Sequence, residues 1–383
     1  MEDRRIELKV LQRVRDVPRA EWDALVGPDD SPFVEHTWLD CLEESGCVGR
    51  KVGWLPAHFA LYRDSKLIAV APAYVKGNSE GEFVFDWSWA DLASRIGVEY
   101  YPKLIFAIPF TPAAGARVLV AKDEPRLDVI RSLAAAVPQI VPELDSMSAH
   151  VLFPREEEAQ AWADTGFLRR HGVQYQFSNP GYATFEDFLK TLSSKKRTQL
   201  RRERKQPEKD GVTIETLSKG DYEDPAIIRD MHRFYVATVD KFSWGRRYLN
   251  ERFFELVAER FADRLSWVFA KRDGKPIAGA FNVKKDKTLY GRYWGAGVEL
   301  PFLHFNVCYY HGIEQCIAEG LTRFEPGAGG EHKRVRGFTP TLTHSVHYLR
   351  DPRMRRILAN HLEKEREHIV GYVESGGNED EPE

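Results

Sequence analysis

A glycine-rich segment near the C-terminus, residues 323–338, carries the side chains best suited to chemistry. It reads RFEPGAGGEHKRVRGF and supplies a carboxylate at Glu325, an imidazole at His332 and an ammonium at Lys333. Acyl transfer to an amine requires a base that accepts the amine proton and a donor that stabilises the developing oxyanion. We expect Glu325 or His332 to act as the base and Lys333 to stabilise charge. The alternative is a glycine turn that carries a surface ion pair.

The same segment is not a nucleotide-binding P-loop. GAGGEHK lacks the spacing and the Ser or Thr hydroxyl that a P-loop requires. In the preceding TRFEP, side chains alternate between the two faces of a strand. If Phe324 packs against a helix, Glu325 therefore faces away from it.

A strongly basic stretch lies at the middle of the chain. Seven of the thirteen residues from Ser193 to Lys205 are Lys or Arg, and Arg197, Arg201 and Arg204 fall on one helical face. Such a face could hold the phosphates of a nucleotide-linked acceptor or of a tRNA acceptor stem. A solvated surface is the alternative, although such surfaces usually mix charges and Glu203 is the one acid here. The residues of this helix that we expect to bind substrate are Lys196, Arg197 and Arg201.

An aromatic strand lies upstream of the glycine-rich segment. LYGRYWG places Tyr290, Arg292 and Trp294 on one strand face and Leu289 and Tyr293 on the other. An arginine flanked by aromatic rings can hold a carboxylate or stack on a ring. The residues of this region that we expect to contact substrate are Arg292, Tyr293, Trp294 and His304.

A second aromatic segment, FDWSW, lies in the first half of the chain. Read as a strand, it offers Asp86 and Ser88 opposite Trp87 and Trp89. We expect Asp86 and Trp87 to contact substrate. Core packing is the alternative, and it is the favoured one for the tryptophans.

A metal site is not expected. His304, Cys308 and His311 share a helical face, a spacing that zinc could use. However, the sequence suggests no fourth ligand, and the neighbouring Phe305, Tyr309 and Ile313 indicate a helix packed into a core.

Composition describes a globular protein of two domains. The chain has 383 residues, 43% of them hydrophobic, and a net charge of -3, which argues against a protein that coats nucleic acid. Its four cysteines form no CxxC pair, so reduced thiols in a cytoplasmic protein are expected. No apolar run approaches the length of about 18 residues that a membrane span needs.

An internal repeat predicts the architecture. HFALYRDSKLIAVA (58–71) and WVFAKRDGKPIAGA (267–280) are identical at six of fourteen positions and both read as β-hairpins. An aromatic strand is expected after each hairpin, EFVFDWSW in the first copy and TLYGRYWG in the second.

The second copy has the clearer order of elements. We expect a helix over 184–206 with a Thr184 cap, the hairpin, a helix from Pro301 to Gly320, and strands at LTRFEP and LTHSVHYL. A long charged helix follows from Asp351. This order indicates an α+β fold with two tandem domains and mixed sheets. The expected boundaries are 1–180 and 181–373, followed by a disordered acidic tail at 374–383.

The duplicated order of elements, the basic helix with its following strand GVTIETL, and FEPGAGGEHKRVRGF resemble the tandem acetyltransferase-like (GNAT) fold of the Fem-type aminoacyltransferases. More specifically, GEFVFDWSWAD, YYPKL, PFTP, GRYWG, PFLHF, CYYHGIE and GEHK resemble the bacterial FemAB-like N-acyltransferases. The resemblance extends from about residue 32 to residue 356.

This resemblance implies an N-acyltransferase that acts on an amine acceptor, with peptidoglycan precursors as one candidate class. The implied co-substrate is an activated acyl donor, either aminoacyl-tRNA or acyl-CoA, and no tightly bound cofactor is implied. The junction WGAGVELPFLHF lacks the Arg/Gln-x-x-Gly-x-Gly/Ala loop that binds coenzyme A in single-domain acetyltransferases, and Pro301 removes a backbone donor there. Acyl-CoA dependence and a non-catalytic module that binds a cell-wall precursor or nucleotide-linked ligand remain the alternatives.

Overall fold

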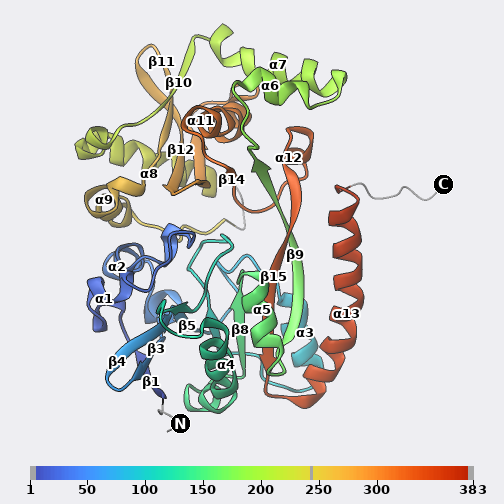
Figure 1. Ribbon diagram of the computed structural model, residues 1–383. Coiled ribbons are helices and arrows are strands. Elements are labelled where there is room, and N and C mark those ends of the chain that lie inside the picture. Colours follow the sequence, from blue (N-terminus) through green and yellow to red (C-terminus); the bar gives the residue numbers. More distant parts are fainter. Residues whose placement is uncertain (1–5, 242–244, 378–383) are drawn as a thin grey trace, which may run out of the picture. The chain divides into compact units, whose positions relative to one another are not determined.

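The computed structural model describes residues 6–241 and 245–377 and divides the chain into two compact units (Figure 1). Unit 1 comprises Met1–Val173 with Leu342–Glu383, and unit 2 comprises Gln174–Thr341. This division differs from the linear one expected from the sequence, because the last strand and the last helix of the chain pack with the first unit.

Unit 1 is built on two sheets. Its strand orders are β1-β3-β4-β7 and β15-β8-β6-β5-β2. The strands are β1 (Ile6–Leu11), β2 (Trp54–Pro56), β3 (His58–Arg63), β4 (Lys66–Ala71), β5 (Ala73–Lys76), β6 (Lys103–Phe106), β7 (Leu119–Val120) and β8 (Ser148–Leu152), with β9 (Leu168–Ser178) and β15 (Thr339–Leu349) running across the unit boundary. The helices are α1 (Arg19–Asp23), α2 (His36–Glu44), α3 (Trp87–Arg95), α4 (Arg126–Glu143), α5 (Glu156–Ala163) and α13 (Pro352–Glu374).

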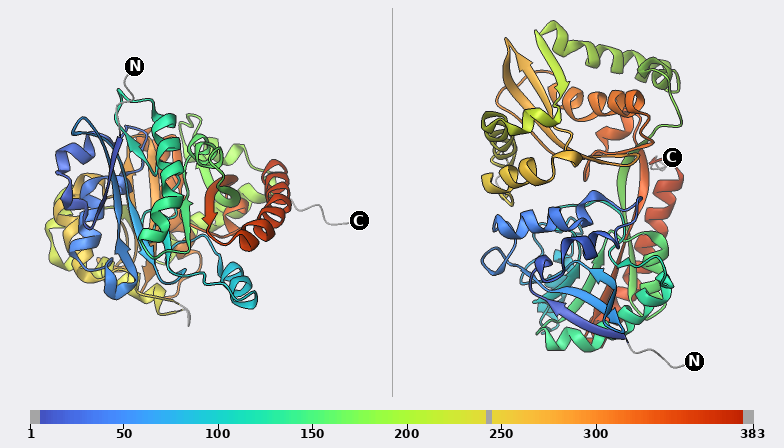
Figure 2. Two further views of the ribbon diagram at one scale, coloured as in Figure 1. Left: turned by 90° about the horizontal axis from the view of Figure 1, so that it is seen from below. Right: turned by 60° about the vertical axis from the view of Figure 1, so that its left-hand side comes forward.

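Helices cover both faces of the second of these sheets (Figure 2). Apolar residues of α4 and α5, among them the fully buried Trp162 of α5, pack against one face. On the other face α3 and α13 bury Trp89, Met354 and Leu358. Asp351 caps α13, since its carboxylate accepts hydrogen bonds from the backbone amides of Arg353 and Met354.

Unit 2 contains one sheet with the strand order β10-β11-β12-β13-β14-β9. Its own strands are β10 (Val212–Thr216), β11 (Val268–Arg272), β12 (Lys275–Lys285), β13 (Thr288–Ala296) and β14 (Arg323–Glu325). The helices are α6 (Phe185–Lys190), α7 (Ser194–Lys209), α8 (Pro225–Val239), α9 (Glu251–Arg260), α10 (Leu303–Phe305), a π-helix (Asn306–Tyr310), α11 (His311–Glu319) and α12 (His332–Val335). Two hydrophobic clusters hold α6, α7, α10, the π-helix and α11 to the sheet.

The two predicted hairpins are confirmed, and they share details that the sequence identity alone does not reveal. β3 pairs with β4 and β11 with β12, both antiparallel, and each pair has a register shift two residues before the turn. Both turns have two residues at positive φ, Asp64 with Ser65 and Asp273 with Gly274. This is the type I′ turn that matches the twist of paired strands. The same bulge and the same turn in both units support the predicted duplication.

The aromatic segment of the first copy is not a strand. Phe83 has a φ of 61°, Asp86 precedes α3, and Trp87 is its first residue. Glu82 and Asp86 both form ion pairs with the buried Lys103, so the chain between them cannot extend. The prediction of a strand over EFVFDWSW was therefore wrong, whereas that of β13 is confirmed.

Two predicted helices are divided. The Thr184 cap is confirmed, since its hydroxyl accepts the amide hydrogen of Asp187, but α6 ends at Lys190 and a second cap at Ser193 begins α7. The helix expected from Pro301 to Gly320 contains the π-helix Asn306–Tyr310 and ends at Gly320, as expected. Of the predicted tail, Glu374 closes α13, while residues 378–383 lie outside the described residues.

The two type I′ turns give a reciprocal prediction. Ser65 carries a side chain at a φ of 65°, whereas Gly274 occupies the equivalent position without one. Ser65→Gly should raise, and Gly274→Ser should lower, the free energy of unfolding by about 1 kcal/mol each. Urea denaturation measures both. Gly220→Ser, at a glycine with open space around it, is the control and should change little. Two changes of the same sign would contradict the assignment of equivalent turns.

Candidate active site

The candidate site in unit 2 begins where two parallel strands stop pairing. β13 and β14 are in register at three residue pairs, the last of them Tyr290 with Glu325. β14 then ends, while β13 continues to Ala296. The glycine-rich loop starts here and crosses close to β13, because a Cβ on Gly291 would lie 3.2 Å from the Cα of Pro326.

Arg292 lies at an irregularity of β13. The pairing with β12 shifts so that Phe281 faces Tyr293 and Asn282 faces Gly291, which leaves Arg292 as the extra residue of a β-bulge. The simple alternation expected for Tyr290, Arg292 and Trp294 therefore breaks at Arg292. Its guanidinium carbon lies 5.6 Å from the centre of the Tyr293 ring.

Phe324 and Glu325 take opposite directions from β14. Phe324 is fully buried in the cluster formed with α11. Glu325, the next residue, is 5% exposed, and its Oε1 lies 3.3 Å from Nε of Arg323. Burial, followed by the nearby Glu325 carboxylate, raises the pKa of Tyr290 to about 12. Glu325 is thus held at the end of the strand beside a cation and a phenol.

Lys333 anchors the glycine-rich loop. Its side chain is buried, and Nζ donates hydrogen bonds to the carbonyl oxygens of Gly327 at 2.7 Å and Ala328 at 3.1 Å. Burial lowers the pKa of Lys333 to about 8. The ammonium therefore both fixes the loop backbone and titrates close to neutral pH.

His332 is the accessible base of this region. Its ring is exposed, and Nε2 lies 2.9 Å from the hydroxyl of Tyr309. Burial, and then the cations Lys333 and Arg336, lower the pKa of His332 below its usual value. The imidazole is therefore neutral near pH 7 and able to accept a proton.

His304 and Trp294 form a stacked pair beside His332. The two ring centres are 4.3 Å apart at an interplanar angle of 28°, and the His304 ring lies 6.1 Å from that of His332. Burial lowers the pKa of His304 to about 3, so this ring stays neutral. Two residues predicted to bind substrate thus lie together beside His332.

This stacked pair lines a pocket of about 470 Å³ in unit 2. The pocket is formed by Lys241, Trp294, Val298, Glu299, Leu300, Pro301, Phe302, Leu303, His304 and Phe305. Apart from Lys241, which follows α8, these residues belong to the segment from the end of β13 to α10, in which the sequence lacks a coenzyme A loop.

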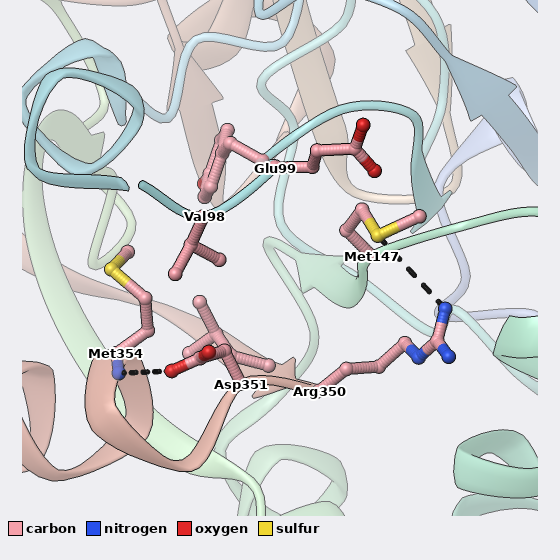
Figure 3. Close-up of a pocket in the computed structure, with 8 residues that line it drawn as sticks. Val98, Glu99, Met147, Arg350, Asp351 and Met354 are labelled. Atoms are coloured by element: carbon pink, nitrogen blue, oxygen red, sulfur yellow. Dashed lines mark hydrogen bonds between the residues drawn. The ribbon is translucent and has the colours of Figure 1, made fainter. Parts of the chain in front are cut away.

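A separate pocket of about 500 Å³ lies in unit 1, where none of the predicted site residues lines it (Figure 3). Its polar wall groups serve the fold: Asp351 binds the backbone amide of Met354, and Arg350 reaches the sulfur of Met147. This pocket therefore offers no feature of the predicted chemistry.

A buried ion pair between Glu203 and Arg336, which the sequence did not reveal, holds the C-terminal end of α12. Arg336 donates three hydrogen bonds of 2.9–3.1 Å to the Glu203 carboxylate, which also accepts one from the Tyr310 hydroxyl. Glu203 is 3% exposed and Arg336 5% exposed. The one signal in the sequence was that Glu203 is the single acid in a basic stretch, where we noted it only as an exception. Tyr309 and Tyr310 were likewise missed as polar partners.

The basic helix α7 is partly neutralised within unit 2. Arg201 forms an exposed ion pair with Glu186, and Arg204 forms one with Glu314. Lys196 and Arg197 are half-buried on the same helix. The arginines expected to bind phosphate thus have intramolecular partners at two of three positions.

The site residues predicted in the first copy of the repeat, Asp86 and Trp87, differ in their surroundings. In unit 1, Asp86 is buried, accepts hydrogen bonds from Lys103 Nζ at 2.5 Å and Tyr100 Oη at 2.6 Å, and so belongs to a buried ion cluster. Trp89 is core, as favoured, whereas Trp87 is 55% exposed and stacks on Phe85. Core packing was therefore the wrong alternative for Trp87.

The residues considered for zinc do not converge. His304 stacks on Trp294, and Nε2 of His311 lies 2.8 Å from the Thr216 hydroxyl. Across 6–241 and 245–377, no group of three or more His, Cys, Asp and Glu side chains could hold a metal ion. All four cysteines are free thiols. No helix in the same ranges is both long and apolar enough to cross a membrane.

Comparisons with solved structures agree with this architecture. The chain resembles FemX, with a TM-score of 0.54 and 12% identity over 90% of this chain and 98% of that one. It also resembles the C-terminal domain of a putative lysylphosphatidylglycerol synthetase from Agrobacterium fabrum, with a TM-score of 0.52 and 13% identity over 94% and 97% of the two chains. A tandem GNAT protein from the clavulanic acid pathway matches with a TM-score of 0.48 and 10% identity over 91% and 99%. The expected α+β fold is confirmed, because the chain shares the fold of FemX.

The sequence matches no curated protein. A family model does match, over residues 13–381, and it describes FemAB-like proteins of peptidoglycan biosynthesis/recognition. The match spans both units, including the glycine-rich loop, α12 and the basic helix. The predicted family is confirmed: the chain belongs to the FemAB-like family of peptidoglycan biosynthesis and recognition.

Proposed function

We propose that the protein is an N-acyltransferase that moves an aminoacyl or acyl group from an activated donor to the amine of a peptidoglycan precursor. One observation carries this proposal. Where β14 ends, a neutral histidine, a buried lysine and an aromatic pocket lie together in unit 2. Membership of the FemAB-like family supports the same reaction class and the cell-wall acceptor.

The reaction assigned to these residues is direct transfer. The acceptor amine attacks the acyl carbonyl carbon, a new C–N bond forms, and the bond from that carbon to the leaving oxygen or sulfur breaks. His332 accepts the amine proton and returns it to the leaving oxygen or sulfur, and Lys333 stabilises the negative charge that develops on the carbonyl oxygen. Glu325 is the alternative base. The remaining rate enhancement comes from holding the two substrates together.

The pocket between β13 and α10 is assigned to the acyl donor. Trp294 and His304 provide a flat surface for the acyl group or for a ring of the donor, and Arg292 and Tyr293 lie on the same strand. Lys196, Arg197 and Arg201 on α7 are assigned to donor or acceptor phosphates. Arg197→Ala with Arg201→Ala should then raise KM in a salt-dependent manner. A KM that is unchanged at any salt concentration would make this helix face a solvated surface.

Two acyl donors distinguish aminoacyl transfer from acyl-CoA-dependent transfer. A mixture of aminoacyl-tRNAs, or acetyl-CoA, is incubated with the protein and a nucleotide-linked muramoyl pentapeptide that bears a free amine. Mass spectrometry should detect an acceptor heavier by one aminoacyl residue with the first donor, because the coenzyme A loop is absent. Acetylation with the second donor would favour the acyl-CoA alternative. Binding of the acceptor without conversion of either donor would contradict transfer and favour a recognition module.

The identity of the base is tested by two changes, each of which removes one titratable group. His332→Gln should lower kcat roughly 100-fold, while KM for the acceptor stays nearly constant. Because neutral histidine is the active form, kcat should fall as the pH is lowered through the pKa of His332. That fall should occur at a pH below the ordinary histidine pKa. Glu325→Gln should change kcat by much less. The reverse ranking would transfer the role of base to Glu325.

The pKa of Lys333 predicts where the rate falls on the alkaline side of the pH–rate profile. The ammonium is the active form, and its pKa is about 8, so kcat/KM should fall as the pH rises through that value. Lys333→Met should lower the rate and remove this limb. An alkaline limb that persists in Lys333→Met would show that another group titrates there.

A further inference from the structure

The carboxylate of Glu203 joins the basic helix α7 to the short helix α12. Its Oε2 accepts hydrogen bonds from Nε and Nη2 of Arg336 and from the Tyr310 hydroxyl. Its Oε1 accepts from Nη2 of Arg336 and from the Gln199 side chain at 2.8 Å. Both carboxylate oxygens are therefore fully engaged inside the unit.

Arg336 carries this connection back to His332. Its Nη1 donates a 2.8 Å hydrogen bond to the backbone carbonyl of His332, and its guanidinium carbon lies 3.3 Å from the centre of the Phe305 ring. A guanidinium fixed by a bidentate carboxylate, a carbonyl and an aromatic face has little freedom. The backbone at His332 is thus tied to α7 through one side chain.

The two tyrosines of the π-helix contact both ends of this connection. Tyr309 binds the His332 ring, and Tyr310 binds Glu203. The π-helix itself is fixed to α7, because the Asn306 side chain donates to the backbone carbonyl of Glu203 at 2.9 Å. A π-helix inserts an extra residue, which allows adjacent tyrosines to reach both partners.

A purely stabilising role does not account for this arrangement. Burying two charges costs desolvation energy, and apolar residues of the same size often stabilise a core equally well. A fully hydrogen-bonded buried network can instead fix one geometry of the groups that it joins. Here the geometry they fix is that of the helix bearing His332 and Lys333.

We propose that Glu203 is a positioning residue, which holds α12 through Arg336 so that His332 and Lys333 face the acyl-transfer site, and which neutralises the Arg336 charge beside His332. The claim about geometry and charge stands on the contacts above. Its consequence for turnover rests on the proposed function.

The charge effect can be measured at His332 itself. Two titratable groups face this ring from neighbouring elements, His304 of α10 and Tyr309 of the π-helix. Two cations, Lys333 and Arg336, face it from its own segment. In Glu203→Gln the Arg336 cation loses its counter-charge, so the pKa of His332 should fall further. NMR titration of labelled histidine, with the resonance assigned from His332→Gln, follows this change without any substrate.

Turnover provides the second readout, with aminoacyl-tRNA and the nucleotide-linked muramoyl pentapeptide as probes. Glu203→Gln should lower kcat by roughly 10- to 100-fold with little change in KM, as expected for a displaced catalytic group. Tyr310→Phe keeps both charges and should give a smaller loss. Tyr222→Phe is its matched control, because the Tyr222 hydroxyl is also buried in unit 2 but bonds only backbone groups of Leu217 and Trp267.

A third variant controls for the loss of a buried carboxylate. Glu158→Gln, at a fully buried carboxylate in unit 1 that binds backbone amides and Arg126, should lower the melting temperature without moving the His332 titration. A folded Glu203→Gln protein in which His332 titrates normally would overturn the proposal. If Glu203→Gln does not fold, a Tyr310→Phe protein as active as Tyr222→Phe would overturn it.

The two readouts also separate this inference from the proposed function. A shifted His332 titration with unchanged turnover supports the charge effect of Glu203 on His332 but overturns its positioning role in turnover. A shifted titration with reduced turnover supports both.

Discussion

A buried lysine needs acceptors for its hydrogens, and Lys333 finds two of them in the glycine-rich loop that precedes it. The loop can supply these carbonyls because Gly327, Gly329 and Gly330 all adopt positive φ angles. This one interaction closes the loop onto the end of β14 and brings α12 beside the π-helix. Together with the Glu203–Arg336 ion pair, that closure fixes the position of His332, its contact with Tyr309 and its proximity to His304.

The two units use the same elements differently. Each contains a parallel strand pair, β6 with β8 in unit 1 and β13 with β14 in unit 2. In unit 1 the end of β8 is occupied by Arg117, which is fully buried and donates to the carbonyl of Leu152 at 2.6 Å. In unit 2 the equivalent position is followed by the glycine-rich loop. The contrast explains why the candidate chemistry is concentrated in unit 2.

Much of the fold and part of the site could be predicted from the sequence. The hairpins were evident because strand pairing and turn chemistry are local, and the Thr184 cap was evident for the same reason. The segment at Asp86 was misread because its conformation depends on Lys103, seventeen residues later, and periodicity carries no information about such an ion pair. Glu203 was recognised only as an exception, because its partners Arg336 and Tyr310 are more than 100 residues away in the chain. The periodicity of a sequence predicts helices, strands and their apolar faces. It does not predict which polar side chains pair when they are far apart in the chain.

The central claim is that unit 2 stabilises the transition state of acyl transfer through Lys333 and His332. The most direct measurement is calorimetric binding of a phosphonamidate analogue of the tetrahedral intermediate, which joins an aminoacyl-adenosine to the amine of the acceptor peptide. The account predicts that this analogue binds at least ~100-fold more tightly than the corresponding planar amide, and that Lys333→Met removes most of the difference. Equal affinity for the phosphonamidate and the amide, or a preference that Lys333→Met leaves intact, would contradict it.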